Sequence, residues 1–417
     1  MNDFKKIVAS AIAGGALLLN LATPAFAGIT LEISGNGSDS ESEVELEYEQ
    51  EVEVNQTNIA EVQNTVKAEA ETGENEANDN TGGEVEITTG DATTNVTVTN
   101  TLNSNVAKVS ACCFGDVTAE ISGNGTDSDN DLDLELEHEV KVNQLNDAFI
   151  LNNVEAESET GDNEAEDNTG GSVSIDTGNA KTTVSVSNAA NSNSAWVTGG
   201  EGDGGSLTLL ITGNGSDSEN EIELELENET EVNQTNLAEI QNDIEAEAET
   251  GENEAEDNTG GDVVIETGDA TVDVTVDNLV NFNWADIDGC GCLEDILAKI
   301  HGNGTDSENE IEAELETELE ANQLNDFDCK GELKDACADV EAEAETGENE
   351  AEDNTVGGDE DPTVETGDAE STVEVGNSGN SNVYGDVPGS EQEWPWGFDF
   401  NFNFSFDLED LLAALLG

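Results

Sequence analysis

The feature that most restricts the fold of this chain is a strict alternation of acidic and apolar residues. In its first occurrence, glutamates fill every odd position from 43 to 53, and apolar residues occupy even positions, namely Val44, Leu46, Tyr48, Val52 and Val54. A period of two residues places all side chains of one kind on one face of a β-strand. A helix would spread the same glutamates around its circumference. The alternation therefore predicts strands that bury one face and expose an acidic face to water.

The alternation belongs to a unit that occurs four times along the chain. A GNG[ST]D element begins at Gly35, Gly123, Gly213 and Gly302, with spacings of 88, 90 and 89 residues. The elements NQxN, TG[ED]NEA and TG[DN]A follow in the same order in every unit. Units one and three share GNGSD and VNQTN, whereas units two and four share GNGTD and NQLND, so the units alternate as A-B-A-B. Self-similarity at a fixed period is typical of a repeat architecture.

These patterns predict an all-β, elongated tandem-repeat array, β-solenoid-like, in which neighbouring units share one core. We expect NQxN to form a turn between two alternating strands, and the Gly-, Asn- and Asp-rich segments to form further turns. Tandem β-sandwich domains are the alternative, because alternating runs of about 12 residues are long for solenoid strands. The expected repeats are residues 28–114, 115–204, 205–293 and 294–382, followed by a C-terminal segment, 383–417.

The first 27 residues have the features of a secretory signal peptide. Lys5 and Lys6 precede an apolar run over residues 7–22, and a small-residue cleavage site follows at Ala25-Phe26-Ala27. We therefore expect cleavage after Ala27 and a secreted or cell-surface location. No later apolar stretch reaches the roughly 20 residues that a membrane helix needs.

The balance of charge excludes two classes of partner. The chain has 99 Asp and Glu against 9 Lys and Arg, a net charge of −90. Nucleic acids and anionic lipid surfaces are both bound through Lys and Arg, so neither is an expected partner. Rows of carboxylates about 7 Å apart along a strand repel one another. Bound divalent cations, a saline habitat or a cationic partner could each offset this repulsion.

The acidic turns are the candidate cation sites, because calcium binds several carboxylate and carbonyl oxygens. Their GNG[ST]D element resembles part of the calcium-binding RTX nonapeptide, G-G-x-G-x-D-x-U-x, with Gly35, Gly37 and Asp39 matching G-x-G-x-D. The apolar U position holds Glu41, and the motif occurs once per unit rather than in consecutive copies. The candidate metal ligands are Asp39, Asp127, Asp129, Asp217 and Asp306.

A second resemblance is to curlin-type amyloid repeats, in which Asn, Ala and Gln recur at fixed offsets and stack in ladders. Three short patches have this character: Asn58-x-Ala60-x-x-Gln63, Asn236-x-Ala238-x-x-Gln241 and Asn253-x-Ala255-x-x-Asn258. The spacing and short repeat length of curlin are absent. The resemblance implies a surface fibre or a role in an extracellular matrix.

The six cysteines favour disulfides over metal sites if the chain is exported. Unit four has about seven more residues than unit two after NQLND, and these contain Cys329 and Cys337, which we expect to form a disulfide. The other four lie in two places that are one full unit apart, as Cys112, Cys113, Cys290 and Cys292. Local bridges and cross-links between chains both remain open for them, and a four-cysteine zinc site would need the two places to be adjacent.

The C-terminal segment differs from the repeats. It places aromatic side chains on one face of an expected strand, as Phe398, Phe400, Phe402, Phe404 and Phe406. Such a strand could cap the last repeat or dock on the sheet of a partner.

The function expected from the sequence is that of an exported structural or adhesive surface protein with acidic cation-binding faces, rather than an enzyme. His138 and His301 are the two histidines, and neither has the neighbours of a catalytic residue. The alternative is a soluble extracellular calcium or mineral binder that folds when metal binds.

Overall fold

The computed structural model of the protein describes residues 4–22, 29–110, 116–198, 205–287, 293–329, 337–355 and 361–385. The chain divides into two compact units, Met1–Tyr384 and Gly385–Gly417, and all four repeats lie in the first. The Phe-rich strand expected at 398–406 and the four cysteines at 112, 113, 290 and 292 lie outside the described residues.

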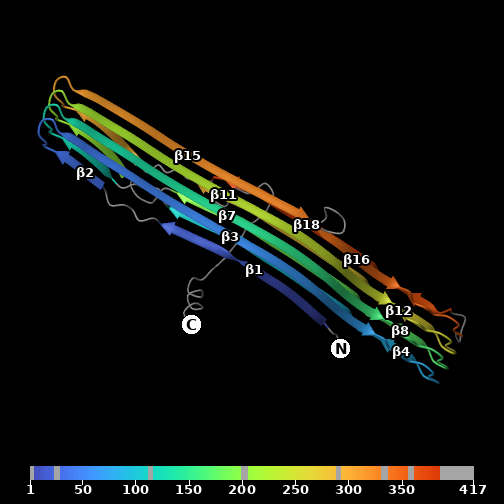
Figure 1. Ribbon diagram of the computed structural model, residues 1–417. Helices are drawn as coiled ribbons and strands as arrows, with labels where there is room; N and C mark the ends of the chain where they lie inside the picture. Colours follow the sequence, from blue (N-terminus) through green and yellow to red (C-terminus); the bar gives the residue numbers. More distant parts are fainter. Residues whose placement is uncertain are drawn as a thin grey trace, which may run out of the picture. The chain divides into compact units, whose positions relative to one another are not determined.

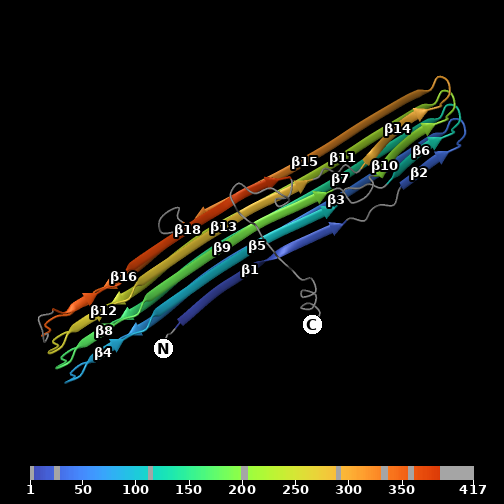
Figure 2. The same cartoon turned by 180° about the vertical axis from the view of Figure 1, so that it is seen from behind.

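Each repeat forms one coil of a β-solenoid. In coil 1, β2 (Ile29–Ser34) leads through a tight turn into β3 (Glu41–Gly73), a strand of 33 residues. The chain then turns back through β4 (Val85–Thr88) and β5 (Ala92–Ser110) on the other side of the coil. The coils lie side by side as long, flat loops (Figure 1, and from behind in Figure 2).

The remaining coils repeat these elements. Coil 2 contains β6 (Val117–Ser122), β7 (Asp129–Gly161), β8 (Val173–Asp176) and β9 (Ala180–Thr198). Coil 3 contains β10 (Gly205–Thr212), β11 (Glu219–Gly251), β12 (Val263–Glu266) and β13 (Ala270–Ile287). Coil 4 contains β14 (Leu293–His301), β15 (Glu308–Cys329), β16 (Ala338–Gly347), β17 (Thr363–Glu365) and β18 (Ala369–Tyr384).

Equivalent strands of successive coils pair in parallel and in register. The four sheets have the orders β15-β11-β7-β3, β14-β10-β6-β2, β17-β12-β8-β4 and β1-β5-β9-β13-β18, and β16 also pairs with β11. This confirms the predicted all-β solenoid. The tandem-sandwich alternative is wrong, because strands from all four repeats share the same sheets.

The core between the two sides of each coil consists of layers of Val, Ile, Leu and Ala. Near the turn that starts each long strand, Ile121, Leu134 and Leu209 are fully buried in one such layer. Burial alternates residue by residue along β7, with inward side chains buried and acidic side chains outward. The buried apolar face supplies the main stabilisation of each strand pair, at about 25 cal/mol per Å² of apolar surface removed from water.

The NQxN elements are not turns, which corrects the sequence prediction. Asn55 and Gln56 lie in the middle of β3, whose alternation continues without a break. The inward Gln56 and Asn58 look like turn residues, but stacking provides each with a partner in the next coil. Asn58, for example, donates from Nδ2 to Asn146 Oδ1 at 3.1 Å. Because buried amides are tolerated when they are hydrogen-bonded, the strand reaches 33 residues rather than about 12.

Ten amide positions of coil 1 start ladders through the stack, and a further ladder starts in coil 2, where Asn130 donates to Asn220 at 3.0 Å. The Asn58 ladder continues from Asn146 to Asn236 at 3.0 Å and from Asn236 to Asn325 at 3.0 Å. The first members of the coil 1 ladders are Asn36, Asn55, Gln56, Asn58, Asn64, Asn75, Asn80, Asn100, Asn103 and Asn105. Each ladder ties the coils into one register, because a shift by one residue would separate the amides.

The repeated glycines are required by the closeness of successive coils. A Cβ on Gly125 would lie 2.4 Å from the backbone nitrogen of Ser38 in coil 1. A Cβ on Gly161 would lie 1.9 Å from the carbonyl oxygen of Gly251 in coil 3. At these positions of the GNG[ST]D and TG[ED]NEA elements, only glycine permits the backbone approach between coils.

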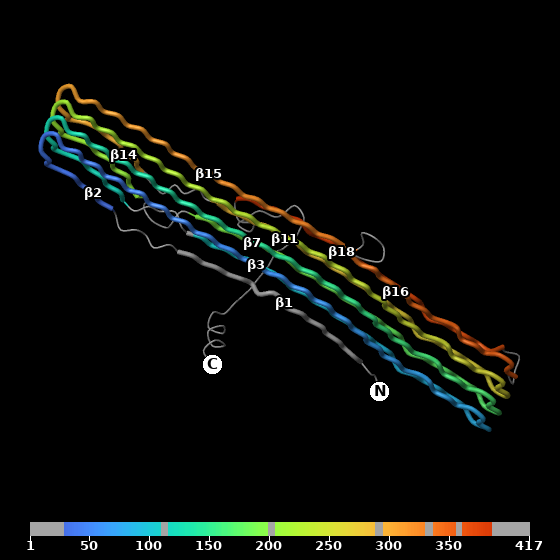
Figure 3. Tube along the Cα trace, in the orientation of Figure 1, coloured from blue at the N-terminus to red at the C-terminus, as the bar shows by residue number. Residues whose placement is uncertain are grey.

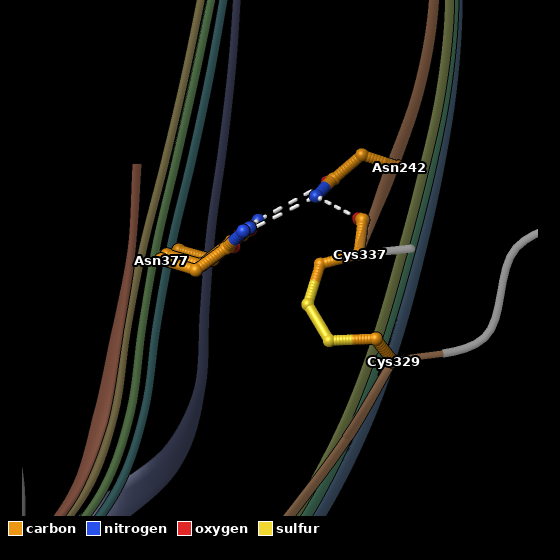
Figure 4. The surroundings of a disulfide bond; sticks show 6 residues. Asn242, Cys329, Cys337 and Asn377 are labelled. Atoms are coloured by element: carbon orange, nitrogen blue, oxygen red, sulfur yellow. Dashed lines mark hydrogen bonds between the residues drawn. A yellow bond between two sulfur atoms is a disulfide. The ribbon is translucent and has the colours of Figure 1, made fainter. Parts of the chain in front are cut away.

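Coil 4 departs from the others at its insertion, where a disulfide joins Cys329 at the end of β15 to Cys337 before β16 (Figure 4). In coil 4 the register partner of Asn242 is Ala338, so no asparagine extends the Asn64 ladder there. Asn242 instead donates from Nδ2 to the carbonyl oxygen of Cys337 at 2.9 Å. The inserted residues thus leave the stacking of coils 3 and 4 intact on both sides, since β15 and β16 both pair with β11.

Residues of the expected signal peptide also take part in a sheet. They form β1 (Phe4–Ala22), which pairs in parallel with β5 and is the outermost strand of that sheet. No helix among the described residues is long and apolar enough to cross a membrane.

Candidate functional site: the acidic face and its carboxylate groups

The outward face of the long strands is a two-dimensional array of carboxylates. In-register pairing places Glu47, Glu135, Glu225 and Glu314 in one row across β3, β7, β11 and β15. Neighbouring strands are about 4.8 Å apart, and outward residues of one strand are about 7 Å apart. Like charges directly opposite one another are destabilising, so this face stores repulsion.

The electrostatic effect of the rows is visible in the pKa of their members. Burial and the adjacent Glu225, Glu47 and Asp133 raise the pKa of Glu135. Burial, followed by Asp129 and Glu221, raises the pKa of Asp131 to about 6. In both cases the charged form is disfavoured, which is the expected effect of desolvation and like charge.

Few cations offset this charge within the chain. The described residues contain three ion pairs, Lys67 with Glu155, Lys141 with Glu139, and Lys181 with Asp273. All three are at least partly exposed, and exposed pairs contribute about 1 kcal/mol or less.

The carboxylates approach most closely at the turns after the long strands. Glu159 at the end of β7, Asp162 just after it and Glu252 of coil 3 have carboxylate oxygens within 4.8 Å of one another. Two further groups of this kind are Glu166, Glu254 and Glu256, and Glu256, Glu350 and Glu352. The stacked turns create these groups, because each turn presents the same acids one coil apart.

Glu159 and Glu249 have the most perturbed acidity in this region. Burial, then the charges of Glu71 and Asp162, raise the pKa of Glu159 to about 7. Burial, then Glu252 and Glu159, raise the pKa of Glu249 to about 7. Both carboxyls thus bind a proton through part of the neutral pH range, and a cation that bound there would compete with that proton.

The aspartates predicted from the GNG[ST]D element lie at the opposite ends of the long strands. Asp39, Asp127, Asp217 and Asp306 occupy equivalent exposed turn positions, and Asp129 begins β7. Among the described residues, none of the five belongs to a group of three carboxylates within 4.8 Å.

The backbone gives these turn aspartates a structural role. All four have left-handed φ angles, from 55° to 60°, a conformation that Asp and Asn adopt more readily than most residues. The N–H of Asp39 donates to the carbonyl oxygen of Thr126 in coil 2 at 2.9 Å, so the turn also stacks on the next coil.

The closest carboxylate groups were not identified as candidate sites from the sequence. The TG[ED]NEA element was recognised as a repeat, but its acids were not predicted to meet. The available signal was their density, since Glu157, Glu159, Asp162, Glu164 and Glu166 fall within ten residues of a glycine turn. Only in-register stacking shows that the acids of one coil lie beside those of the next.

The fold defines the chain as a parallel β-solenoid with asparagine ladders. Comparisons with protein-family models, with curated proteins and with solved structures found no match. The resemblances to curlin-type and RTX repeats therefore remain local, and the features shown are the repeated parallel strands and the ladders themselves.

Proposed function

We propose that the protein is an exported structural or adhesive component of the cell surface or extracellular matrix. The observation that carries this proposal is the continuous stack of four coils. The coils share amide ladders, and their long strands present one outward face of carboxylates in regular rows. Such a fold resists local opening, because each coil is hydrogen-bonded to its neighbour along its whole length. The acidic faces are proposed to bind cations.

The location is tested by fractionating the producing cells and labelling them with an antibody for electron microscopy. We expect the protein on the cell surface or in the extracellular material, with a mature sequence beginning at Gly28. Retention of the full chain in the cytoplasm would contradict the proposal.

A second candidate function is a soluble extracellular calcium binder that folds when metal binds. The group of Glu159, Asp162 and Glu252 favours it, because three carboxylates within 4.8 Å match the oxygen ligands that calcium takes.

Calcium titration by calorimetry and circular dichroism tests both cation binding and the second candidate. We expect Glu252→Gln to weaken calcium binding and to reduce the proton release that accompanies it. The control Glu61→Gln removes the same charge from an exposed position outside the three groups, and we expect it to change calcium binding less. Equal effects of the two substitutions would rule out a localised site. Strand content that is unchanged in a chelator would rule out folding on metal binding.

A further inference from the structure

The stack of coils ends in two open edges. The first edge belongs to coil 1, with β2, β3 and β4, and the last edge belongs to coil 4, with β14, β15, β16, β17 and β18. Figure 3 shows them as the blue and the orange-to-red margins of the trace. Strands at such edges have backbone N–H and C=O groups that no neighbouring strand uses, and they can pair with another chain.

The amide ladders give the two edges opposite hydrogen-bonding character. In most ladders the Nδ2 of one coil donates to the Oδ1 of the next, as in the series Asn75, Asn163, Asn253 and Asn349 at 2.7–2.8 Å. In coil 4 this series ends at Asn349, whose Nδ2 is buried and has no hydrogen-bond partner. The last edge therefore holds a donor that is positioned for an acceptor in a following coil.

The first edge has the complementary defect. The Asn103 ladder also runs from coil 1 to coil 4, with Asn103 donating to Asn191 at 3.0 Å. Its first member, Asn103, is buried in the full chain, where β1 pairs with β5 up to Leu102 and again from Ser104, and its Oδ1 has no donor. Removal of β1 would leave this acceptor open to a donor from another coil. Buried polar atoms without partners are rare and destabilising, so each needs an explanation. An asparagine of a preceding coil would donate to Asn103 Oδ1, as Asn103 Nδ2 donates to Asn191 Oδ1.

The last edge also exposes side chains that the fold buries elsewhere. Leu315 in β15 is 58% exposed, whereas its register partner Leu226 in β11 is 7% exposed. Other exposed residues of coil 4 also have buried register partners in coil 3, namely Ile296, Ile311, Leu319, Val364, Val373, Val375 and Tyr384. Covering them with one more coil would bury an apolar surface that the single chain leaves in water.

Gly37 on the first edge is unexplained by the single chain. Its equivalents Gly125, Gly215 and Gly304 must be glycine, because a Cβ would lie 2.4–2.5 Å from backbone atoms of the preceding coil. A Cβ on Gly37 would meet nothing within 4 Å, and the φ angle of Gly37 is not in the left-handed range. A glycine at this position becomes necessary once another coil precedes coil 1.

We infer that the last edge of one molecule docks on the first edge of a second copy, head to tail, with the internal register continued across the junction. Coil 4 is of type B and coil 1 of type A, so the A-B-A-B alternation also continues. Asn349 would then donate to Asn75 of the second copy, and Asn380 to Asn103. A contact between two different faces of the same chain does not close and generates a filament.

The second copy fits the last edge better than the C-terminal segment does. The run of alternating Phe covers only residues 398–406 of the sequence, whereas β15 alone has 22 residues. The Phe segment also lacks the spaced glycine and amide pattern that matches the ladders. Coil 1 provides this pattern along the full edge.

The inference depends on the proposed export in one respect. In the full chain, β1 pairs with β5 and covers that part of the first edge. Cleavage after Ala27 would remove β1 and expose β5, while every pairing among the four coils remains. The processed chain, beginning at Gly28, is therefore the form that assembles.

The test compares three forms of the processed chain by sedimentation velocity and electron microscopy, in about 1 M NaCl to screen the acidic faces. They are the wild type, Gly37→Ala, and Thr30→Ala as a control at an exposed position of β2. We expect filaments from the wild type and from Thr30→Ala. We expect Gly37→Ala to remain monomeric, with the circular dichroism spectrum and melting temperature of the wild-type fold.

Three results would overturn the inference: a wild type that stays monomeric, a Gly37→Ala variant that assembles as the wild type does, or assembly that is lost when residues 385–417 are removed. A chain truncated after Tyr384 keeps all four coils but lacks the C-terminal segment. It therefore tests whether that segment, rather than a second copy, occupies the last edge. Filaments that require residues 385–417 would show that assembly uses the Phe-rich segment instead. Surface location without filaments would leave the proposed function standing and reject only the head-to-tail contact.

Discussion

Replacing Asn146 by alanine should destabilise the protein far more than replacing Asn143, although both are asparagines of the same strand. Asn146 faces inward and is fully buried, and Asn143 faces outward and is half-buried. The side chain of Asn146 hydrogen-bonds to Ser192, Asn193, Asn236, Asn58 and Asn105, at 2.9–3.1 Å.

The size of the effect follows from these contacts. The amide of Asn146 has two N–H protons shared by three acceptors, and its oxygen accepts two bonds, which amounts to about four full hydrogen bonds. At about 1 kcal/mol each, Asn146→Ala should lower the free energy of unfolding by about 4 kcal/mol. Asn143 donates one hydrogen bond to Asn55 and accepts one from Asn233, and water can replace both. Asn143→Ala should therefore lower the free energy of unfolding by less than about 1 kcal/mol.

Guanidinium unfolding followed by circular dichroism measures this difference. Because the two substitutions share the same change in strand propensity, that contribution cancels in the comparison. Equal losses of stability, or a loss below about 1 kcal/mol for Asn146→Ala, would refute the view that inward amide ladders stabilise the stack.

Three further predictions concern the turns and the insertion. Gly125→Ala should lower the free energy of unfolding by about 1–3 kcal/mol through overpacking, measured by guanidinium unfolding, and an unchanged midpoint would contradict it. Because folding raises the pKa of Glu159 and Glu249 to about 7, stability should fall as pH rises from about 4.5 to about 7. Replacing both residues by Gln should reduce the change in melting temperature between about pH 4.5 and about pH 7. A variant whose melting temperature depends on pH as the wild type's does would argue against the raised pKa values. Replacing Cys329 and Cys337 by Ser should lower the unfolding free energy by about 2–3 kcal/mol, measured without reductant, and no change would indicate free thiols.

Strand type could be predicted from the two-residue alternation, and the number of repeats from the recurring GNG[ST]D, NQxN, TG[ED]NEA and TG[DN]A elements. The solenoid is the fold that the sequence favours, with tandem β-sandwiches as the alternative. The length of the strands could not be predicted. Gln56 and Asn58 interrupt the apolar face, and local propensity assigns such residues to turns. Their burial depends on partners that lie 88 residues away, so only the stacked coils show that the strand continues.

The break in the alternation of the returning strands β5, β9, β13 and β18 could not be predicted from the sequence pattern either. Asn103 has a φ angle of 54°, and its equivalents Asn191, Asn281 and Asn380 have values of 59–64°. This left-handed residue allows both Leu102 and Asn103 to face inward, which breaks the alternation. The signal was the recurrence of asparagine at one position in four repeats, but a recurrent Asn is equally consistent with a turn.

The acidic outer face could be predicted from the sequence, but the carboxylate groups within it could not. An acidic outer face follows directly from the alternation of Glu with apolar residues. The closest carboxylates, such as Glu159 and Glu252, come from different coils and are separated by 93 positions in the sequence. Their approach is a property of the register, which local sequence patterns do not specify.

The alternation of two coil types has a consequence for how this gene can change in length. Each coil contacts only its neighbours, so the chain contains only the junctions A-to-B and B-to-A. Duplicating one A-B pair would add two coils without creating a new kind of junction. Duplicating a single coil would create an A-to-A or a B-to-B junction, which the chain does not contain. The unit of viable insertion or deletion is thus a pair of coils, and related chains should differ in length by about twice the 88- to 90-residue period.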